Sequence, residues 1–86
     1  MSASYLEARQ LISNALDIPL NSIKVESSID NLEAWDSIGH MRIVLDIEQS
    51  IGHELEAEQV LALECVQDVK RLLDFSGEAG LGKGKT

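Results

Sequence analysis

A helical repeat in the middle of the chain opens with the stretch Trp35-Asp36-Ser37-Ile38-Gly39-His40-Met41-Arg42-Ile43-Val44-Leu45-Asp46-Ile47-Glu48. Asp36 is typical of an N-cap, whose side chain accepts a backbone N–H of the first helical turn. Ser37 then becomes the first helical residue, beside N–H groups that have no partner within the helix and at the positive end of the helix dipole. We therefore expect a serine hydroxyl at a helix start, where an attached anion would be stabilised.

Outward from this stretch, the spacing of apolar residues predicts helices and no strands. The central helix should run from Ser37 to Ile51 and end at Gly52. Its apolar face is expected to consist of Ile38, Met41, Val44, Leu45 and Ile51, interrupted by Glu48. The same spacing predicts a first helix from Ser4 to Leu16, a short third helix from Glu56 to Leu63 and a last helix from Val66 to Phe75.

Two segments lack this periodicity. Residues 17–35 contain a proline, two asparagines and three serines, and we expect a long loop with apolar anchors at Ile18, Leu20, Ile23, Val25, Ile29 and Leu32. Residues 77–86 hold four of the six glycines, so we expect the last helix to stop before Gly77 and a disordered tail to follow.

Size and charge exclude several classes of function. A chain of 86 residues makes one domain, too small for a deep catalytic cleft. Its net charge of -8 argues against nucleic acid and favours basic protein partners. The single cysteine excludes an internal disulfide. Neither a signal peptide nor a run of 18 apolar residues occurs, so we expect a cytoplasmic chain without a membrane partner.

The triplet Asp36-Ser37-Ile38, together with the helix that follows, resembles the phosphopantetheine attachment site of acyl carrier proteins. The resemblance covers about Tyr5 to Phe75, with isoleucine at position 38 where the family most often has leucine. It implies an all-α fold, a four-helix acyl-carrier-like bundle with three main helices, a short third helix and a long loop between the first two. Residues 1–76 would form the acyl carrier domain and residues 77–86 the Gly/Lys tail.

The resemblance also implies a function for Ser37. A phosphopantetheinyl transferase would move 4′-phosphopantetheine from coenzyme A onto the Ser37 oxygen, with Asp36 and Ile38 completing the cofactor-binding motif. The thiol of the arm would carry acyl groups as thioesters between enzymes of fatty-acid, polyketide or related specialised biosynthesis. The protein would be a substrate of these enzymes and not itself an enzyme, and we expect a monomer.

Two further groups of residues follow from the resemblance. Glu48, Glu56 and Glu58 are expected to dock basic patches of acyl-loading and acyl-transferring enzymes, while Arg42 interrupts the acidic run and suggests dedicated partners. The core is mostly aliphatic, and we hypothesise that an acyl cleft is lined by Met41, Val44, Leu45, Val60, Leu61 and Val69.

Neighbours of Ser37 allow other interpretations. Gly39 either leaves room for the arm or a partner, or has no role. A Ser-His-Asp hydrolase using His40 is rejected because Asp36 is better placed to cap the helix and no Gly-x-Ser-x-Gly elbow exists, so we expect a surface histidine. Metal binding is rejected because His53, the adjacent glutamate and the cysteine lack paired-ligand spacing.

Two alternatives to an acyl carrier stay open. The first is an aminoacyl or peptidyl carrier, although those proteins usually show glycines before the Asp-Ser pair where this chain has Ala34-Trp35. The second is an unmodified helical module that binds basic proteins through its acidic surface. A phosphate-loop-like run, residues 79–86, lacks the strand and helix that a nucleotide site needs.

Overall fold

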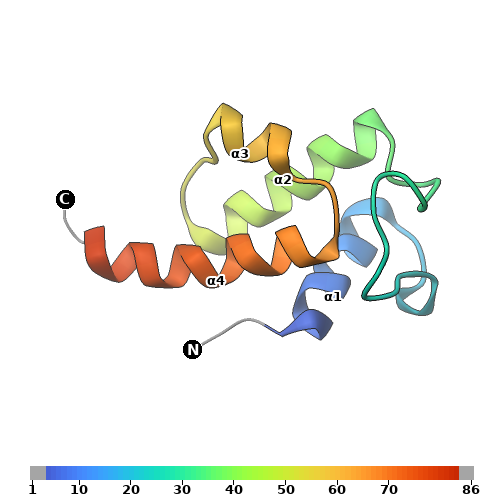
Figure 1. Cartoon of the computed structure of the whole chain (residues 1–86), viewed down its shortest axis with the longest axis horizontal. Coiled ribbons are helices and arrows are strands. Elements are labelled where there is room, and N and C mark those ends of the chain that lie inside the picture. Colours follow the sequence, from blue (N-terminus) through green and yellow to red (C-terminus); the bar gives the residue numbers. More distant parts are fainter. Residues whose placement is uncertain (1–3, 84–86) are drawn as a thin grey trace.

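The computed structural model describes residues 4–83, with side chains up to residue 74. Its elements are α1 (Tyr5–Leu16), the short 3-10 helix η1 (Leu20–Ser22), α2 (Ser37–Ile51), α3 (Ala57–Ala62) and α4 (Val66–Lys83). Every regular element in the described range is a helix, which confirms the all-α bundle expected from the sequence (Figure 1). None of these helices is long and apolar enough to cross a lipid bilayer.

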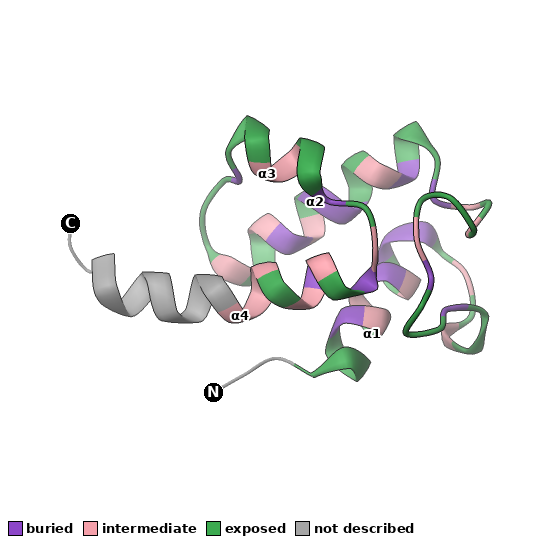
Figure 2. Ribbon diagram, in the orientation of Figure 1, coloured by how far each residue is buried: buried purple, intermediate pink, exposed green. Residues whose placement is uncertain are grey.

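The three long helices α1, α2 and α4 enclose the core, and short α3 lies beside α2 on the outside of the bundle (Figure 1). The long loop closes one end of the bundle and leads into the start of α2. Figure 2 shows the buried positions on the inward faces of the helices. The core comprises Ala8, Ile12, Ala15, Leu16, Ile23, Trp35, Ile43, Val44, Ile47, Leu55, Leu63, Val66 and Val69.

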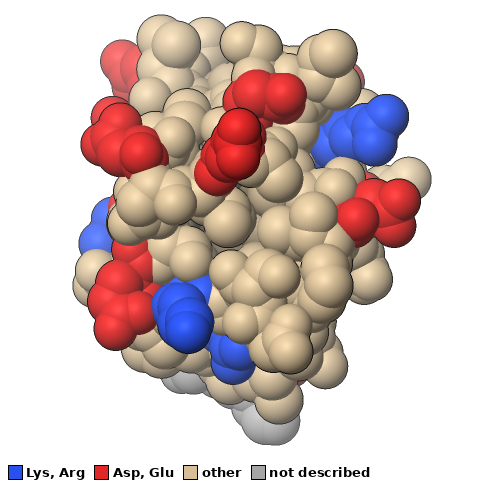
Figure 3. Space-filling model, turned by 90° about the vertical axis from the view of Figure 1, so that its right-hand side faces the viewer, with Lys and Arg blue, Asp and Glu red and all other residues tan. Residues whose placement is uncertain are grey.

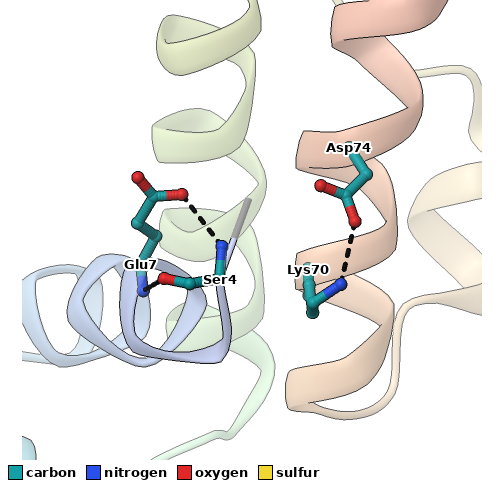
Figure 4. Close-up of polar contacts among 4 residues, drawn as sticks. All are labelled: Ser4, Glu7, Lys70 and Asp74. Carbon is teal, nitrogen blue, oxygen red and sulfur yellow. Dashed lines mark hydrogen bonds and ion pairs between the residues drawn. The ribbon is translucent and has the colours of Figure 1, made fainter. Parts of the chain in front are cut away.

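A capping box begins α1. The Ser4 hydroxyl accepts the Glu7 backbone N–H at 3.0 Å, and the Glu7 carboxylate accepts the Ser4 N–H at 3.0 Å (Figure 4). These two bonds satisfy donors that a helix start leaves free. In the same close-up, Lys70 of α4 pairs with Asp74 at 2.9 Å. The Lys70 ammonium also lies 5.3 Å from the centre of the Tyr5 ring, so the start of α1 contacts α4.

Hydrogen bonds to its backbone hold much of the long loop in place. Arg9 of α1 donates to the carbonyls of Ile23 and Leu20, at 2.7 Å and 3.3 Å. Ile23 itself is fully buried, as expected of an anchor. Val25 and Ile29 are exposed instead, so their expected role as anchors is wrong. Backbone polar groups, rather than apolar side chains at every position, therefore fix much of this loop.

The loop also holds the start of α4. The Ser27 carbonyl accepts the Val66 N–H at 3.1 Å, and the Ile29 N–H donates to the Glu64 carbonyl at 2.8 Å. An isolated antiparallel bridge joins Ser28 and Cys65 between these bonds. Two segments that are far apart in the sequence are thus joined through their backbones at the base of the last helix.

The last helix is longer than its apolar pattern predicts. We expected it to stop before Gly77, but α4 continues to Lys83. A nucleated helix gains one backbone hydrogen bond for each added residue, and no proline interrupts this segment. The expected helix end at Phe75 is therefore wrong. Residues 84–86 of the expected tail lie outside the described residues, and the division into a carrier domain and a tail stays a prediction.

Candidate functional site

Asp36 caps α2 and leaves Ser37 at its first position, as the sequence predicts. The Asp36 carboxylate accepts the Gly39 backbone N–H at 2.8 Å, and the Asp36 carbonyl accepts the His40 N–H at 2.7 Å. Ser37 is exposed, as are Asp36 and Ile38 on either side of it. The hydroxyl of Ser37 is therefore open to a modifying enzyme. A phosphodiester there would lie at the positive end of a 15-residue helix, so the corner fits a phosphate-linked group.

Behind this exposed corner lies a partly buried polar bridge. Trp35 is 2% exposed, and its indole N–H donates to Nδ1 of His40 at 3.0 Å. The other ring nitrogen of His40, Nε2, lies 2.9 Å from the carbonyl oxygen of Val60 in α3. The Trp35 and His40 rings stack with centres 6.3 Å apart and planes inclined by 29°. His40 thus links the residue before the N-cap to a different helix.

This bridge corrects the expectation for His40 and involves two residues, Trp35 and Val60, whose contact with it the sequence did not predict. We expected His40 to be a surface histidine, but it is half buried and both of its ring nitrogens have partners. For Trp35, the sequence indicates no more than a departure from peptidyl carriers. The sequence signal for the Trp35–His40 contact was an indole donor just before the helix start and an imidazole in the first turn of the helix. No such signal exists for Val60, because its contact with His40 depends on where α3 lies.

Gly39 is needed for packing inside the bundle. A Cβ atom at this position would lie 2.5 Å from Cδ2 of Leu16 and 2.7 Å from the carbonyl oxygen of Ala34. Gly39 is buried, so its missing side chain leaves no room for an arm or a partner. Instead, it lets the start of α2 approach the end of α1 and the loop. Neither interpretation from the sequence, room for a ligand or no role, is right.

The expected apolar face of α2 is wrong at three positions. Ile38, Met41 and Leu45 are 68%, 51% and 56% exposed. The side chains of α2 that fill the core are those of Ile43, Val44 and Ile47, and they continue the row that begins at Gly39. Nearly every side of this helix carries apolar residues, so spacing alone permits more than one buried face. The close approach at Gly39 selects the face that packs against α1.

The six residues of the hypothesised acyl cleft differ in their exposure. Val44 and Val69 are buried in the core, whereas Met41, Leu45 and Leu61 are exposed, Leu61 to 80%. Val60 is half buried. An acyl cleft lined by these six residues stays a hypothesis. A hollow of about 450 Å³ does lie nearby, lined by Leu45, Glu48, Gln49, Gly52, His53 and Glu54.

The three acidic residues expected to dock partners lie in different surroundings. The Glu48 carboxylate accepts the Leu55 N–H at 2.9 Å and so holds the chain just before α3. Glu56 caps α3 and forms a capping box with Gln59, whereas Glu58 is exposed. Figure 3 shows that acidic and basic side chains are interspersed on the face that carries the long loop. On that face the acidic groups form no continuous patch.

Comparison with known proteins agrees with this geometry. A family model described as the phosphopantetheine attachment site matches residues 7–73. A relative named Acyl carrier protein 3, from Ralstonia nicotianae, is 32% identical over 63 residues, which cover 73% of this chain and 72% of the relative. The family's cofactor is covalently attached 4′-phosphopantetheine. The chain therefore belongs to the acyl carrier protein family.

Proposed function

We propose that Ser37 carries the phosphopantetheine arm and that the chain presents acyl groups to successive enzymes of fatty-acid, polyketide or related specialised biosynthesis. The arm supplies a terminal thiol that holds the acyl group as a thioester. The observation that carries this proposal is the exposed Ser37 hydroxyl directly after the Asp36 cap, inside a segment that matches the attachment-site family.

The residues around Ser37 have separate tasks in this proposal. Asp36 orients the helix start through its bond to the Gly39 N–H. The free N–H groups of the first turn and the helix dipole would stabilise the phosphodiester by about 0.3–1 kcal/mol, which is too little to drive its formation. The transferase must therefore supply the catalysis, with cations that offset the negative charge of Asp36.

A row of exposed apolar side chains supports docking to client enzymes. Ile38, Met41 and Leu45 follow one side of α2, and Leu61 of α3 is also exposed. Exposed apolar groups with a polar rim are typical of interaction surfaces. We propose that Glu58, with Glu48 and Glu56 at the rim, attracts basic partners, while the apolar row supplies contact area.

The test is intact-protein mass spectrometry after incubation with coenzyme A, magnesium and a broad-specificity phosphopantetheinyl transferase. The wild-type chain should gain one phosphopantetheine. Ser37→Ala should gain none, while Ser50→Ala, at an exposed serine on the last turn of the same helix, should be modified normally. If the wild type stays unmodified beside a carrier protein that is modified, the unmodified interaction module becomes the better explanation.

A loading assay separates the two kinds of carrier. The modified protein would be offered acyl and aminoacyl donors with their loading enzymes, and the mass gained on the arm would be measured. Acyl loading supports the proposed function. Exclusive aminoacyl loading would establish the aminoacyl or peptidyl carrier instead.

A further inference from the structure

Polar contacts from α2 hold α3 in place. None of the six residues of α3 is buried, and the buried anchors of this segment, Leu55 and Leu63, lie outside the helix. On the α2 side, Glu48 accepts the Leu55 N–H and His40 contacts the Val60 carbonyl, each at 2.9 Å. His40, Val44 and Glu48 are four residues apart, so one row of α2 faces α3.

The Trp35 contact fixes which nitrogen of His40 bears the proton. An indole N–H can only donate, so Nδ1 of His40 must accept, and the proton of the neutral ring is on Nε2. That N–H then donates to the Val60 carbonyl in the last turn of α3, which also accepts the Leu63 N–H at 3.4 Å. A single neutral tautomer therefore satisfies both contacts.

We propose that His40 is a positioning residue that joins the Trp35–Ser37 corner and α3 into one unit. The bridge fixes how α3 lies beside the attachment serine, and with it the shape of the surface that a phosphopantetheinyl transferase meets. The bridge itself stands independently of carrier activity, whereas its effect on the transferase rests on the proposed function.

Several charged residues lie on the elements around the imidazole. Asp36 and Glu48 accept backbone N–H groups of Gly39 and Leu55. The remaining charged groups on the loop end, α2 and the α3 segment are Glu33, Arg42, Asp46, Glu54, Glu56, Glu58 and Glu64. In the part of the chain with described side chains, no ion pair involves His40. Its two hydrogen bonds are thus the direct polar links of the ring in this range.

The first measurement needs no variant. The ring nitrogens of His40 in the wild-type chain would be assigned by ¹⁵N-detected NMR at about pH 8, where free histidine is neutral. We expect Nε2 to bear the proton, Nδ1 to be unprotonated and the indole N–H of Trp35 to exchange slowly. A protonated Nδ1, or a mixture of both tautomers, would overturn the bridge.

The second measurement compares His40→Phe with His53→Phe. His53 is an exposed histidine near α3, so the control makes the same substitution without cutting the bridge. In His40→Phe, amides of residues 60–63 should exchange about three- to tenfold faster than in wild type, as expected from the loss of one hydrogen bond. Amides in α1 should be unchanged, and His53→Phe should match wild type. Equal exchange of residues 60–63 in all three chains would contradict the proposal.

Fluorescence then tests the contact directly, because Trp35 is the single tryptophan of the chain. Its emission in His40→Phe should differ from wild type, because the indole N–H loses its acceptor. His53→Phe should keep the wild-type emission. Equal emission in all three chains would show that the indole does not contact His40.

Transfer kinetics test the effect on the attachment site. With a phosphopantetheinyl transferase, His40→Phe should raise KM for the carrier about three- to tenfold with kcat little changed, because the Ser37 hydroxyl itself is intact. An unchanged KM would overturn the role in positioning. If NMR shows the bridge but Ser37 is not modified, the proposed carrier function is wrong and the bridge is confirmed. If Ser37 is modified but NMR shows no bridge, the carrier function is supported and the bridge is wrong.

Discussion

The two sides of α2 carry similar residues and have opposite surroundings. On one side, Ile43 and Ile47 are fully buried against the bundle. On the other, Met41 and Leu45 are more than half exposed. Hydrophobicity does not distinguish these side chains, so it cannot by itself identify the core face. The close contact at Gly39 therefore orients this helix, and the second apolar row stays exposed.

The strongest test of this comparison removes one side chain from each side of α2. Ile47→Ala should lower the free energy of unfolding by about 2–5 kcal/mol, because it deletes a fully buried side chain and leaves a cavity. Leu45→Ala should stay within about 0.5 kcal/mol of wild type. Urea unfolding followed by circular dichroism measures both. Similar losses for the two variants would mean that the assignment of buried and exposed sides is wrong.

A side chain at Gly39 tests what orients the helix. Gly39→Ala should cost about 1–3 kcal/mol of stability, because overpacking against Leu16 and the Ala34 carbonyl outweighs the better helix propensity of alanine.

Gly52→Ala is the matched control for this glycine. Gly52 has a φ of 83° with nothing near its Cβ position, so its replacement costs only the left-handed strain of about 1–2 kcal/mol. Only Gly39→Ala should shift the amide resonances of both Leu16 and Ala34 in NMR spectra. If Gly39→Ala does not shift these resonances, close packing is not the reason for glycine at position 39.

Two variants of Asp36 separate its role as a hydrogen-bonding cap from the effect of its negative charge. Asp36→Ala should lower stability by about 1 kcal/mol, because the Gly39 N–H loses its acceptor. Asp36→Asn keeps an oxygen acceptor and should unfold within a few tenths of a kcal/mol of wild type. Thermal unfolding of the three chains checks this order. If Asp36→Asn is as unstable as Asp36→Ala, the charge of the carboxylate matters more than the cap.

The smallest effect on stability is expected on the exposed row. Leu45→Ser and Leu61→Ser should each change the free energy of unfolding by no more than about 0.5 kcal/mol. If this row meets client enzymes, both should raise KM in an acyl-transfer assay, whereas Gln49→Ser, at another exposed position of α2, should not. Normal KM values in the leucine variants would remove the row from the docking surface.

Residue patterns predict the structure correctly where neighbouring residues decide it. The start of α2 depends on an Asp36 cap and its end on Gly52 in the left-handed conformation, and both were predicted at the observed residues. The helices α1 and α3 also lie where apolar spacing and capping residues placed them. The prediction is wrong for Val25 and Ile29, whose apolar side chains are exposed because backbone hydrogen bonds hold much of the loop.

Local sequence is enough to predict the helical class, most helix boundaries and the place of Ser37 at a capped helix start, because these depend on residues within one or two turns. The packing of the helices was needed to find which side of α2 is buried, why Gly39 is required and that His40 joins Trp35 to α3. Each of these depends on atoms brought together from different elements, and such distances are set by how the helices pack and not by the spacing of residues along one of them.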